Sequence, residues 1–413
     1  MKKSLLFLLT VAITIGSTVT AQSTIKTFKE GKLVGLKNEE GYVILPPTYK
    51  RINSVGLDFF SFSDNYKYGL LNSRGEVILE PKYDRITGFN KNGISVMSDH
   101  EVEDKFIYSP DYKYGAIDTN GVLLIEPKYD VLHNFNDNNV AIFKIGEGYG
   151  LIMSSGKILV EPKLQEIKPI NGFGIAFFKL DNKFGMLNDK GEFLHKAEWD
   201  GIDERMGKGY FGVVKNGKKA ALREDGEFLT DFSYDDILKF GGCSCENGKS
   251  NKTVAPALKE GKWGFIDTIG EIFIAPQYES VQYFRNAKAG VKKDGKWGFI
   301  NESNEVVIPF EYDSVVVFKG EEDQLAKVMV NGKYGLINVQ NEMVVPAIYD
   351  EMDQMSENRA AVRNGTKWGY INEKGDLVIP MQFDKAYEFY KLKASVLVKK
   401  KWKKIDQMGN VIK

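Results

Sequence analysis

Cysteine is almost missing from this 413-residue chain, which contains only Cys243 and Cys245. Two cysteines cannot form the disulfide framework on which many small secreted folds rely, so a hydrophobic core must hold the fold together. Because a single residue separates them, we expect a local disulfide between Cys243 and Cys245, or two inert thiols. Pairing with another molecule, and a metal or redox role, are the alternatives.

Histidine is nearly as scarce. His100, His133 and His195 are the three in the chain, and no two of them have the spacing of metal ligands. The sequence also lacks the Gly-x-Ser-x-Gly elbow of serine hydrolases and the Gly-x-x-x-x-Gly-Lys-Ser/Thr loop of phosphate binders. We therefore predict no catalytic residue, no metal ligand and no cofactor-binding residue, and expect a protein that is not an enzyme.

An excess of positive charge is missing too, because 56 lysines and arginines balance 56 acids. This balance gives no electrostatic reason to expect nucleic acid or an anionic membrane as a partner.

The chain has one apolar run of note, from Leu5 to Ile15, and it is shorter than the ~20 residues that span a membrane. Lys2 and Lys3 precede the run and small residues ending at Ala21 follow it, which is the order of a secretory signal peptide. We predict a signal peptide at 1–21, no membrane span after its removal, and export to the periplasm, the cell surface or the medium.

An aromatic residue followed by glycine recurs about every 35 residues. With that glycine as position 0, successive units are separated by 34, 46, 35, 35, 35, 44, 34, 37, 34 and 34 residues. The eleven residues at position 0 are Gly35, Gly69, Gly115, Gly150, Gly185, Ala220, Gly264, Gly298, Gly335, Gly369 and Lys403. A period of this size indicates a tandem array, which we place at 22–413 with insertions at about 91–111 and 241–261.

Two turns recur in each unit. Asn or Asp stands at position +3 in most units, and Gly at +6 in nine of the eleven, with Asn304 and Asn341 in the other two. Glycine and asparagine tolerate a positive φ, so we predict a type I turn with a left-handed residue at +6. Asn-Gly, Asp-Gly and Glu-Gly pairs before the aromatic residue predict a second, two-residue hairpin turn.

These turns separate three strands, which in one copy are expected at 325–330, 333–338 and 342–349. Trp263 and Phe265 fall on one face of a middle strand and Gly264 and Ile266 on the other, so we predict burial on both faces. The missing side chain of Gly264 would let a backbone or an aromatic ring approach closely. Proline near +12 predicts a strand end or an edge strand.

A 35-residue unit is too small to fold alone, so its aromatic residues must pack against neighbouring units. We predict an all-β fold of about eleven three-stranded meander repeats in an open, superhelical, solenoid-like array, with a closed β-propeller-like toroid as the alternative. The weakest interface, or a bend, is expected near residues 196–232, where the repeats are most degenerate. The predicted structural core comprises Trp263, Gly264, Gly270, Tyr278, Trp297, Gly298, Tyr312, Tyr334, Gly335, Tyr349, Trp368 and Gly369.

Charged residues also follow the period. A lysine stands at −2 in most units and an acid at +15, as in Lys296 and Asp313. Paired carboxylates could suggest a glycoside hydrolase. An acid that recurs once in each unit, however, is better explained by a structural role in every unit than by one active site. We expect these acids to cap a turn or to pair with the lysines.

The aromatic-Gly pair, the following Asn/Asp and Gly, and the Pro-x-Tyr-Asp ending resemble the bacterial WG-repeat (KWG-repeat) family from about Val34 to Lys413. The pairs at Val34-Gly35, Lys219-Ala220 and Trp402-Lys403 depart from this pattern. The resemblance implies an all-β interaction module and no catalytic residues.

From these observations we expect an exported, non-catalytic scaffold that binds a protein or glycan of the cell envelope. A carbohydrate-binding module that stacks glycans on exposed aromatics is the alternative, and an envelope glycan hydrolase is less favoured. We expect specificity to lie in the two insertions and in the degenerate repeats.

Overall fold

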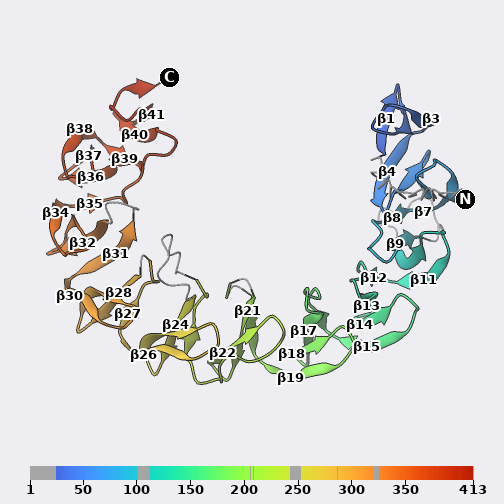
Figure 1. The fold of residues 1–413 in the computed structure, drawn as a ribbon, viewed down its shortest axis with the longest axis horizontal. Coiled ribbons are helices and arrows are strands. Elements are labelled where there is room, and N and C mark those ends of the chain that lie inside the picture. Colours follow the sequence, from blue (N-terminus) through green and yellow to red (C-terminus); the bar gives the residue numbers. More distant parts are fainter. Residues whose placement is uncertain are drawn as a thin grey trace, which may run out of the picture. The chain divides into compact units, whose positions relative to one another are not determined.

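The computed structural model describes residues 25–100, 112–204, 206–207, 209–241, 253–285, 287–319 and 325–412. All regular elements in these ranges are strands, and they form eleven antiparallel sheets, one for each repeat counted in the sequence (Figure 1). The prediction of an all-β tandem array is therefore confirmed. The expected signal peptide at 1–21, Cys243, Cys245 and parts of both insertions lie outside the described residues.

The chain divides into two compact units, the first made of residues 1–169 and 189–191 and the second of 170–188 and 192–413. The strands of the first unit are β1 (Lys26–Glu30), β2 (Leu33–Lys37), β3 (Val43–Tyr49), β4 (Arg51–Gly56), β5 (Phe59–Ser63), β6 (Tyr68–Leu71), β7 (Val77–Tyr83), β8 (Arg85–Ile86), β9 (Ile94–Asp99), β10 (Lys113–Asp118), β11 (Leu123–Tyr129), β12 (Val131–Leu132), β13 (Val140–Ile145), β14 (Gly148–Met153), β15 (Ile158–Leu164) and β16 (Glu166–Ile167).

The strands of the second unit are β17 (Ile175–Leu180), β18 (Lys183–Asn188), β19 (Phe193–Trp199), β20 (Gly201–Asp203), β21 (Tyr210–Lys215), β22 (Lys218–Arg223), β23 (Asp236–Ile237), β24 (Val254–Lys259), β25 (Lys262–Asp267), β26 (Ile272–Tyr278), β27 (Ser280–Val281), β28 (Lys288–Lys293), β29 (Lys296–Asn301), β30 (Val306–Tyr312), β31 (Ser314–Lys319), β32 (Leu325–Val330), β33 (Lys333–Ile337), β34 (Met343–Tyr349), β35 (Glu351–Met352), β36 (Ala360–Asn364), β37 (Lys367–Ile371), β38 (Leu377–Phe383), β39 (Lys385–Ala386), β40 (Ala394–Val398), β41 (Lys401–Ile405) and β42 (Val411–Ile412).

Most sheets contain four strands rather than the three we predicted. In the sheet β27-β28-β29-β30, the added strand is β27, only two residues long, at positions +16 and +17 of the preceding repeat. It pairs antiparallel with β28 and so joins the end of one repeat to the start of the next. Among the described strands of each unit, no sheet pairs the first repeat with the last, which is the pairing that would close a ring.

The predicted close approach at position 0 is a contact with a backbone carbonyl. The register between β25 and β26 shifts between the pairs Trp263↔Tyr278 and Phe265↔Ile274. A Cβ atom added to Gly264 would lie 2.3 Å from the carbonyl oxygen of Ile274. Only glycine leaves room for this bulge, because real Cβ atoms do not approach a backbone oxygen so closely. Ala220 is tolerated in its repeat because single bridges replace a regular third strand there.

Both predicted turns have the expected backbone. The residue at +6 has a positive φ whether it is Gly270 (84°) or Asn304 (63°). The side-chain oxygen of Asp267 accepts hydrogen bonds from the N–H groups of Ile269 (3.0 Å) and Glu271 (2.9 Å), which fixes the first turn. In the second turn both central residues have positive φ, as in Glu260 (53°) and Gly261 (74°), the geometry of a type I′ hairpin.

The hydrophobic cores lie between successive sheets, as nearest-neighbour stability requires. One core combines Phe265, Ile274 and Tyr278 of one sheet with Val291 and Ile300 of the next. Side chains on both faces of the middle strands are thus buried, as predicted from the aromatic and apolar pattern. The third strand is an edge strand in each sheet that has one, so proline in it removes no ladder bond from a central strand.

A phenylalanine at +20 was missed by the sequence analysis. Phe284 is 1% exposed and lies 4.9 Å, centroid to centroid, from Phe265. Five other repeats have phenylalanine at the same position: Phe89, Phe135, Phe240, Phe318 and Phe389. Most of them follow a two-residue strand, whereas Phe318 lies within β31. The buried members add a second aromatic ring to the core between repeats.

The boundary between the two compact units falls after residue 169, earlier than the 196–232 segment where we expected the weakest interface. That segment lies inside the second unit. There Lys219 takes the aromatic position and is 8% exposed, with its ammonium 3.0 Å from Asp203 and 3.2 Å from Asp236.

The described residues include no helix long and apolar enough to cross a membrane.

Candidate functional site

The lysine at −2 and the acid at +15 form an ion pair that recurs along the chain. Lys367 Nζ lies 2.5 Å from Asp384 Oδ1, and Lys333 pairs with Asp350 in the same way. The second oxygen of Asp350 accepts a hydrogen bond from the N–H of Gly365, in the first hairpin of the next sheet, at 2.7 Å. Each such carboxylate thus links two repeats, and the expected pairing is confirmed.

These bonds stabilise the ionised carboxylates. The hydrogen bond from Lys333, and then the one from Gly365, hold the pKa of Asp350 below its usual value. The same causes lower the pKa of Asp200 and Asp235. The carboxylates serve the repeats in which they stand, which is the structural role we expected of an acid present once per unit.

One pair in the first unit is expanded into a cluster. Lys67 Nζ lies 3.0 Å from Asp84 and 2.5 Å from Asp99, and His100 Nδ1 lies 2.6 Å from Asp84. Burial alone would raise the pKa of Asp84, but the hydrogen bonds from Lys67 and His100 outweigh it and lower that pKa. Asp84, Asp99 and His100 could offer three ligand atoms to a cation. The Lys67 ammonium already bonds both carboxylates, so it competes directly with such a cation.

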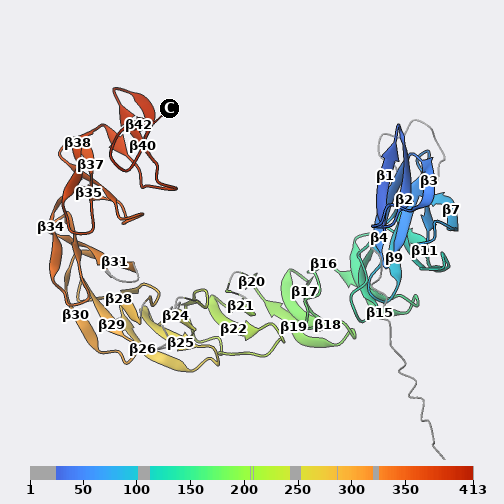
Figure 2. The same cartoon turned by 45° about the horizontal axis from the view of Figure 1, so that its top comes forward.

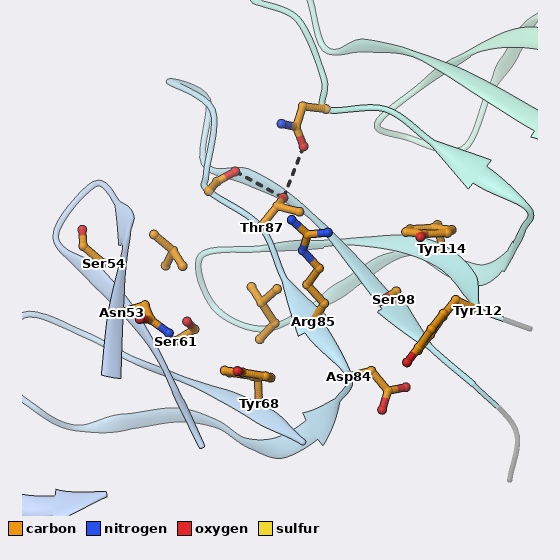
Figure 3. Close-up of a pocket in the computed structure, with 14 residues that line it drawn as sticks. Asn53, Ser54, Ser61, Tyr68, Asp84, Arg85, Thr87, Ser98, Tyr112 and Tyr114 are labelled. Carbon is orange, nitrogen blue, oxygen red and sulfur yellow. Dashed lines mark hydrogen bonds between the residues drawn. The ribbon is translucent and has the colours of Figure 1, made fainter. Parts of the chain in front are cut away.

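A pocket of about 720 Å³ lies beside this cluster, within the first unit (Figure 3). Its lining comes from β4, β5, β6, β8, β9 and β10 and from the segments that connect or follow strands of this unit: Asn53, Ser54, Val55, Ser61, Tyr68, Asp84, Arg85, Ile86, Thr87, Gly88, Ser98, Tyr112, Tyr114 and Asn134. Its volume is in the range of small-molecule sites, which is about 300–1,000 Å³. Tyr112 stands next to the first insertion, where we expected specificity to lie.

Short side chains create the hollow. Ser98 on β9 faces Tyr114 on β10, the aromatic residue at −1. In the next repeat the facing residue is Lys144, whose ammonium lies over the ring of Tyr149, 5.4 Å from its centroid. Ser98 is too short to cover Tyr114, so this tyrosine lines the pocket instead.

The pocket contains hydroxyl groups that have no protein partner. Ser61 is 3% exposed and Ser98 is 4% exposed, and neither hydroxyl hydrogen-bonds to a described residue. Both hydroxyls are open to the pocket, so a ligand that fills it has to hydrogen-bond them or leave them unpaired. Arg85 is exposed, and its guanidinium forms no ion pair with the described residues. In the view of Figure 3 it stands between Tyr68 and the pair Tyr112 and Tyr114.

A second surface feature is most regular in the second unit, although Val43, Val77 and Ile158 of the first unit are exposed at the same repeat position. The residue at +8 is apolar and exposed in every repeat of this unit, and it begins the third strand wherever the sheet has one. We call these residues the edge row: Phe193, Phe228, Ile272, Val306, Met343, Leu377 and Val411. Their exposed fractions lie between 40% for Phe228, which sits in an isolated bridge, and 57% for Ile272.

An acid precedes the edge-row residue in six of these seven repeats. These acids are Glu192, Glu227, Glu271, Glu305, Glu342 and Asp376, and all are exposed. Several also bond the turn, as where the amide of Asn301 donates to Glu305 at 2.7 Å. The edge of the unit therefore repeats an acidic residue followed by an apolar one.

The predicted structural core residues lie between the sheets or at their turns. Tyr278 and Tyr312 are each 3% exposed, and Tyr349 and Trp368 are each 7% exposed. Trp263, Trp297 and Tyr334 are half-buried, and Gly264, Gly298, Gly335 and Gly369 are buried. Gly270 is half-buried in its turn. The candidate disulfide between Cys243 and Cys245 falls outside the described residues.

A family model described as WG containing repeat matches seven segments, at residues 68–98, 114–149, 149–184, 263–297, 297–334, 334–368 and 368–402. Together they cover more than half of the chain. The chain belongs to the WG-containing repeat family.

Solved structures similar to this WG-repeat chain differ strongly in sequence. A eukaryotic initiation factor shares 11% identity over 78% of this chain and 95% of its own, with a TM-score of 0.33. The dihydro-heme d1 dehydrogenase NirN shares 9% identity over 68% of this chain and 74% of its own, with a TM-score of 0.32. PorZ, a surface component of the type-IX secretion system of Porphyromonas gingivalis, shares 7% identity over 89% of this chain and 76% of its own, with a TM-score of 0.22. No curated protein matches the chain.

Proposed function

We propose that this WG-repeat chain is an exported, non-catalytic scaffold that binds a partner protein of the cell envelope through the edge row. The observation that supports this most is the exposed apolar residue at the same place in every repeat of the second unit. Exposed apolar residues that occur singly need no explanation, whereas an ordered series suits a protein interface. Export is inferred from the composition of residues 1–21.

The edge row suggests what the partner offers. Its apolar residues alternate along the array with acids such as Glu305 and Asp376, so the partner segment should carry apolar and basic side chains. The third strands have a free edge, yet proline in them, as at Pro309 and Pro380, removes a backbone donor. Recognition therefore relies on side chains more than on addition of a strand.

The repeated aromatics give less support to glycan stacking along the whole array. Tyr278, Tyr312 and Tyr349 lie in the cores between sheets and have little free ring surface. The repeated carboxylates at +15 also give little support to a hydrolase, because they bond lysines and backbone N–H groups.

The proposal can be tested with two matched double variants. In the first, Val306→Lys and Met343→Lys place charge on the edge row of two sheets. In the second, Ser280→Lys and Ser314→Lys place the same charge on the opposite edge of those sheets, which is formed by β27 and β31. Another repeat has Lys385 at this position. The wild type and both variants are used to capture proteins from envelope extracts.

We expect the wild type and the Ser280/Ser314 variant to retain the same protein, and the Val306/Met343 variant to lose it. Retention by all three proteins, or by none, would refute binding through the edge row. Export has its own test, since protein recovered outside the cytoplasm should begin at Gln22.

A further inference from the structure

We propose that the pocket of the first unit is a binding site for a carboxylate-bearing saccharide. This site goes beyond the proposed function, because it lies in the other compact unit from the edge row and uses different chemistry. Three features of the pocket carry the inference: two serine hydroxyls that open into it, an arginine without a carboxylate partner, and three tyrosine rings.

The hydroxyls of Ser61 and Ser98 favour a polar ligand over an apolar one. Both residues are more than nine-tenths buried, and neither hydroxyl has a hydrogen-bond partner in the described protein. An apolar ligand would leave them unsatisfied, at a cost of about 1–3 kcal/mol for each group. A polyhydroxylated ligand can donate to and accept from both. Asn53 and Asn134 add amide groups to the same lining.

Arg85 defines the charge of the ligand. Asp84 is its neighbour in the chain, but the Asp84 carboxylate bonds Lys67 and His100 instead. The Arg85 guanidinium is thus available in the pocket and can form two parallel hydrogen bonds with a carboxylate.

The tyrosines favour a sugar over a peptide. Tyr68, Tyr112 and Tyr114 all line the pocket, and Ser98 leaves the Tyr114 ring uncovered where lysines cover the rings of Tyr149 and Phe184. The C–H faces of a pyranose pack well on such rings while its hydroxyls reach the polar groups. A volume of about 720 Å³ is enough for a short oligosaccharide.

The test uses the full chain on an array of uronic-acid and sialic-acid oligosaccharides, each printed beside a counterpart whose carboxylates are reduced to alcohols. We expect the wild type to retain at least one acidic oligosaccharide and to bind its reduced counterpart at least tenfold more weakly. Arg85→Gln should remove this preference for the acidic form. Ser98→Lys should abolish both interactions, because it introduces the residue that fills the equivalent place at Lys144.

Lys385→Gln is the control, since Lys385 stands at the repeat position of Arg85 in a sheet of the second unit and its loss should change nothing. Circular dichroism of each variant verifies that the sheets are intact. Failure of the wild type to retain any acidic oligosaccharide would overturn the proposal, as would unchanged binding by Arg85→Gln or by folded Ser98→Lys. None of these results bears on capture through the edge row, which the Val306/Met343 variant tests separately.

Discussion

Replacing Gly264 with alanine tests the physical basis of the repeat signature. The added Cβ would lie 2.3 Å from the Ile274 oxygen and 2.7 Å from the Pro276 nitrogen, and both are backbone atoms that cannot rotate away. The bulge in β26 would have to move, at a cost that we place at about 3 kcal/mol, as for overpacking in a core.

Two other glycines separate this steric effect from the general cost of replacing glycine. Gly261 has a positive φ of 74° but open space around its Cβ position, so Gly261→Ala should cost about 1–2 kcal/mol. Gly201 has open space and no positive φ, and Gly201→Ala should be neutral or stabilising by roughly 0.4–1 kcal/mol.

Native-state hydrogen exchange, followed by mass spectrometry, is the suitable assay because it reports each sheet separately in a repeat protein. Exchange in β25 and β26 should rise about 100-fold in Gly264→Ala, since each 1.4 kcal/mol is a factor of ten. A rise no larger than that caused by Gly261→Ala would refute the steric explanation of position 0.

Three further predictions concern single contacts. Asp350→Asn should lower the urea midpoint of unfolding at pH 7 but not near pH 2. The pKa of Asp350 is lower in the folded state than in the unfolded state, where it is about 3.9. The stability that the carboxylate contributes is therefore complete above the unfolded-state pKa and is lost as the pH falls through the folded-state pKa. A difference that persists in acid would contradict this. The Tyr278 hydroxyl donates to the side-chain oxygen of Asn304 at 2.6 Å, so a double-mutant cycle with Tyr278→Phe and Asn304→Gly should give about 1 kcal/mol of coupling, and additivity would exclude the bond. Phe284→Ala should cost about 3–5 kcal/mol and accelerate exchange in β25 and β28, and a uniform effect along the chain would argue against separate cores between sheets.

Much of the fold could be predicted from the sequence because its turns impose a strict backbone requirement. A left-handed residue is needed at +6, and only Gly or Asn satisfies it at low cost, as at Gly270 and Asn304. That requirement, repeated eleven times, sets the period and the ends of the longer strands.

Features without a local pattern were missed. The two-residue strands have no shared composition, as Arg85–Ile86 and Ser280–Val281 illustrate, because two backbone hydrogen-bonding residues need no periodicity. Phe284 could have been found from the sequence, since phenylalanine recurs at +20. Position +20, however, falls between the predicted strands, where we expected only loops.

The pocket could not be predicted because it arises from missing side-chain volume. Ser98 is an ordinary residue in the sequence, and only its place opposite Tyr114 makes it important. The edge row was overlooked for a different reason. Val306 and Met343 look like ordinary strand residues, and their exposure depends on which strand lies at the edge of the sheet.

Site-specific photo-cross-linking tests the central claim about the edge row most directly. A photoreactive phenylalanine analogue is placed at Val306, on one edge of its sheet, or at Ser280, on the opposite edge, in cells that produce the protein. The proposal predicts a discrete protein adduct from position 306 and none from position 280. No adduct from position 306, or the same adduct from both positions, would contradict it.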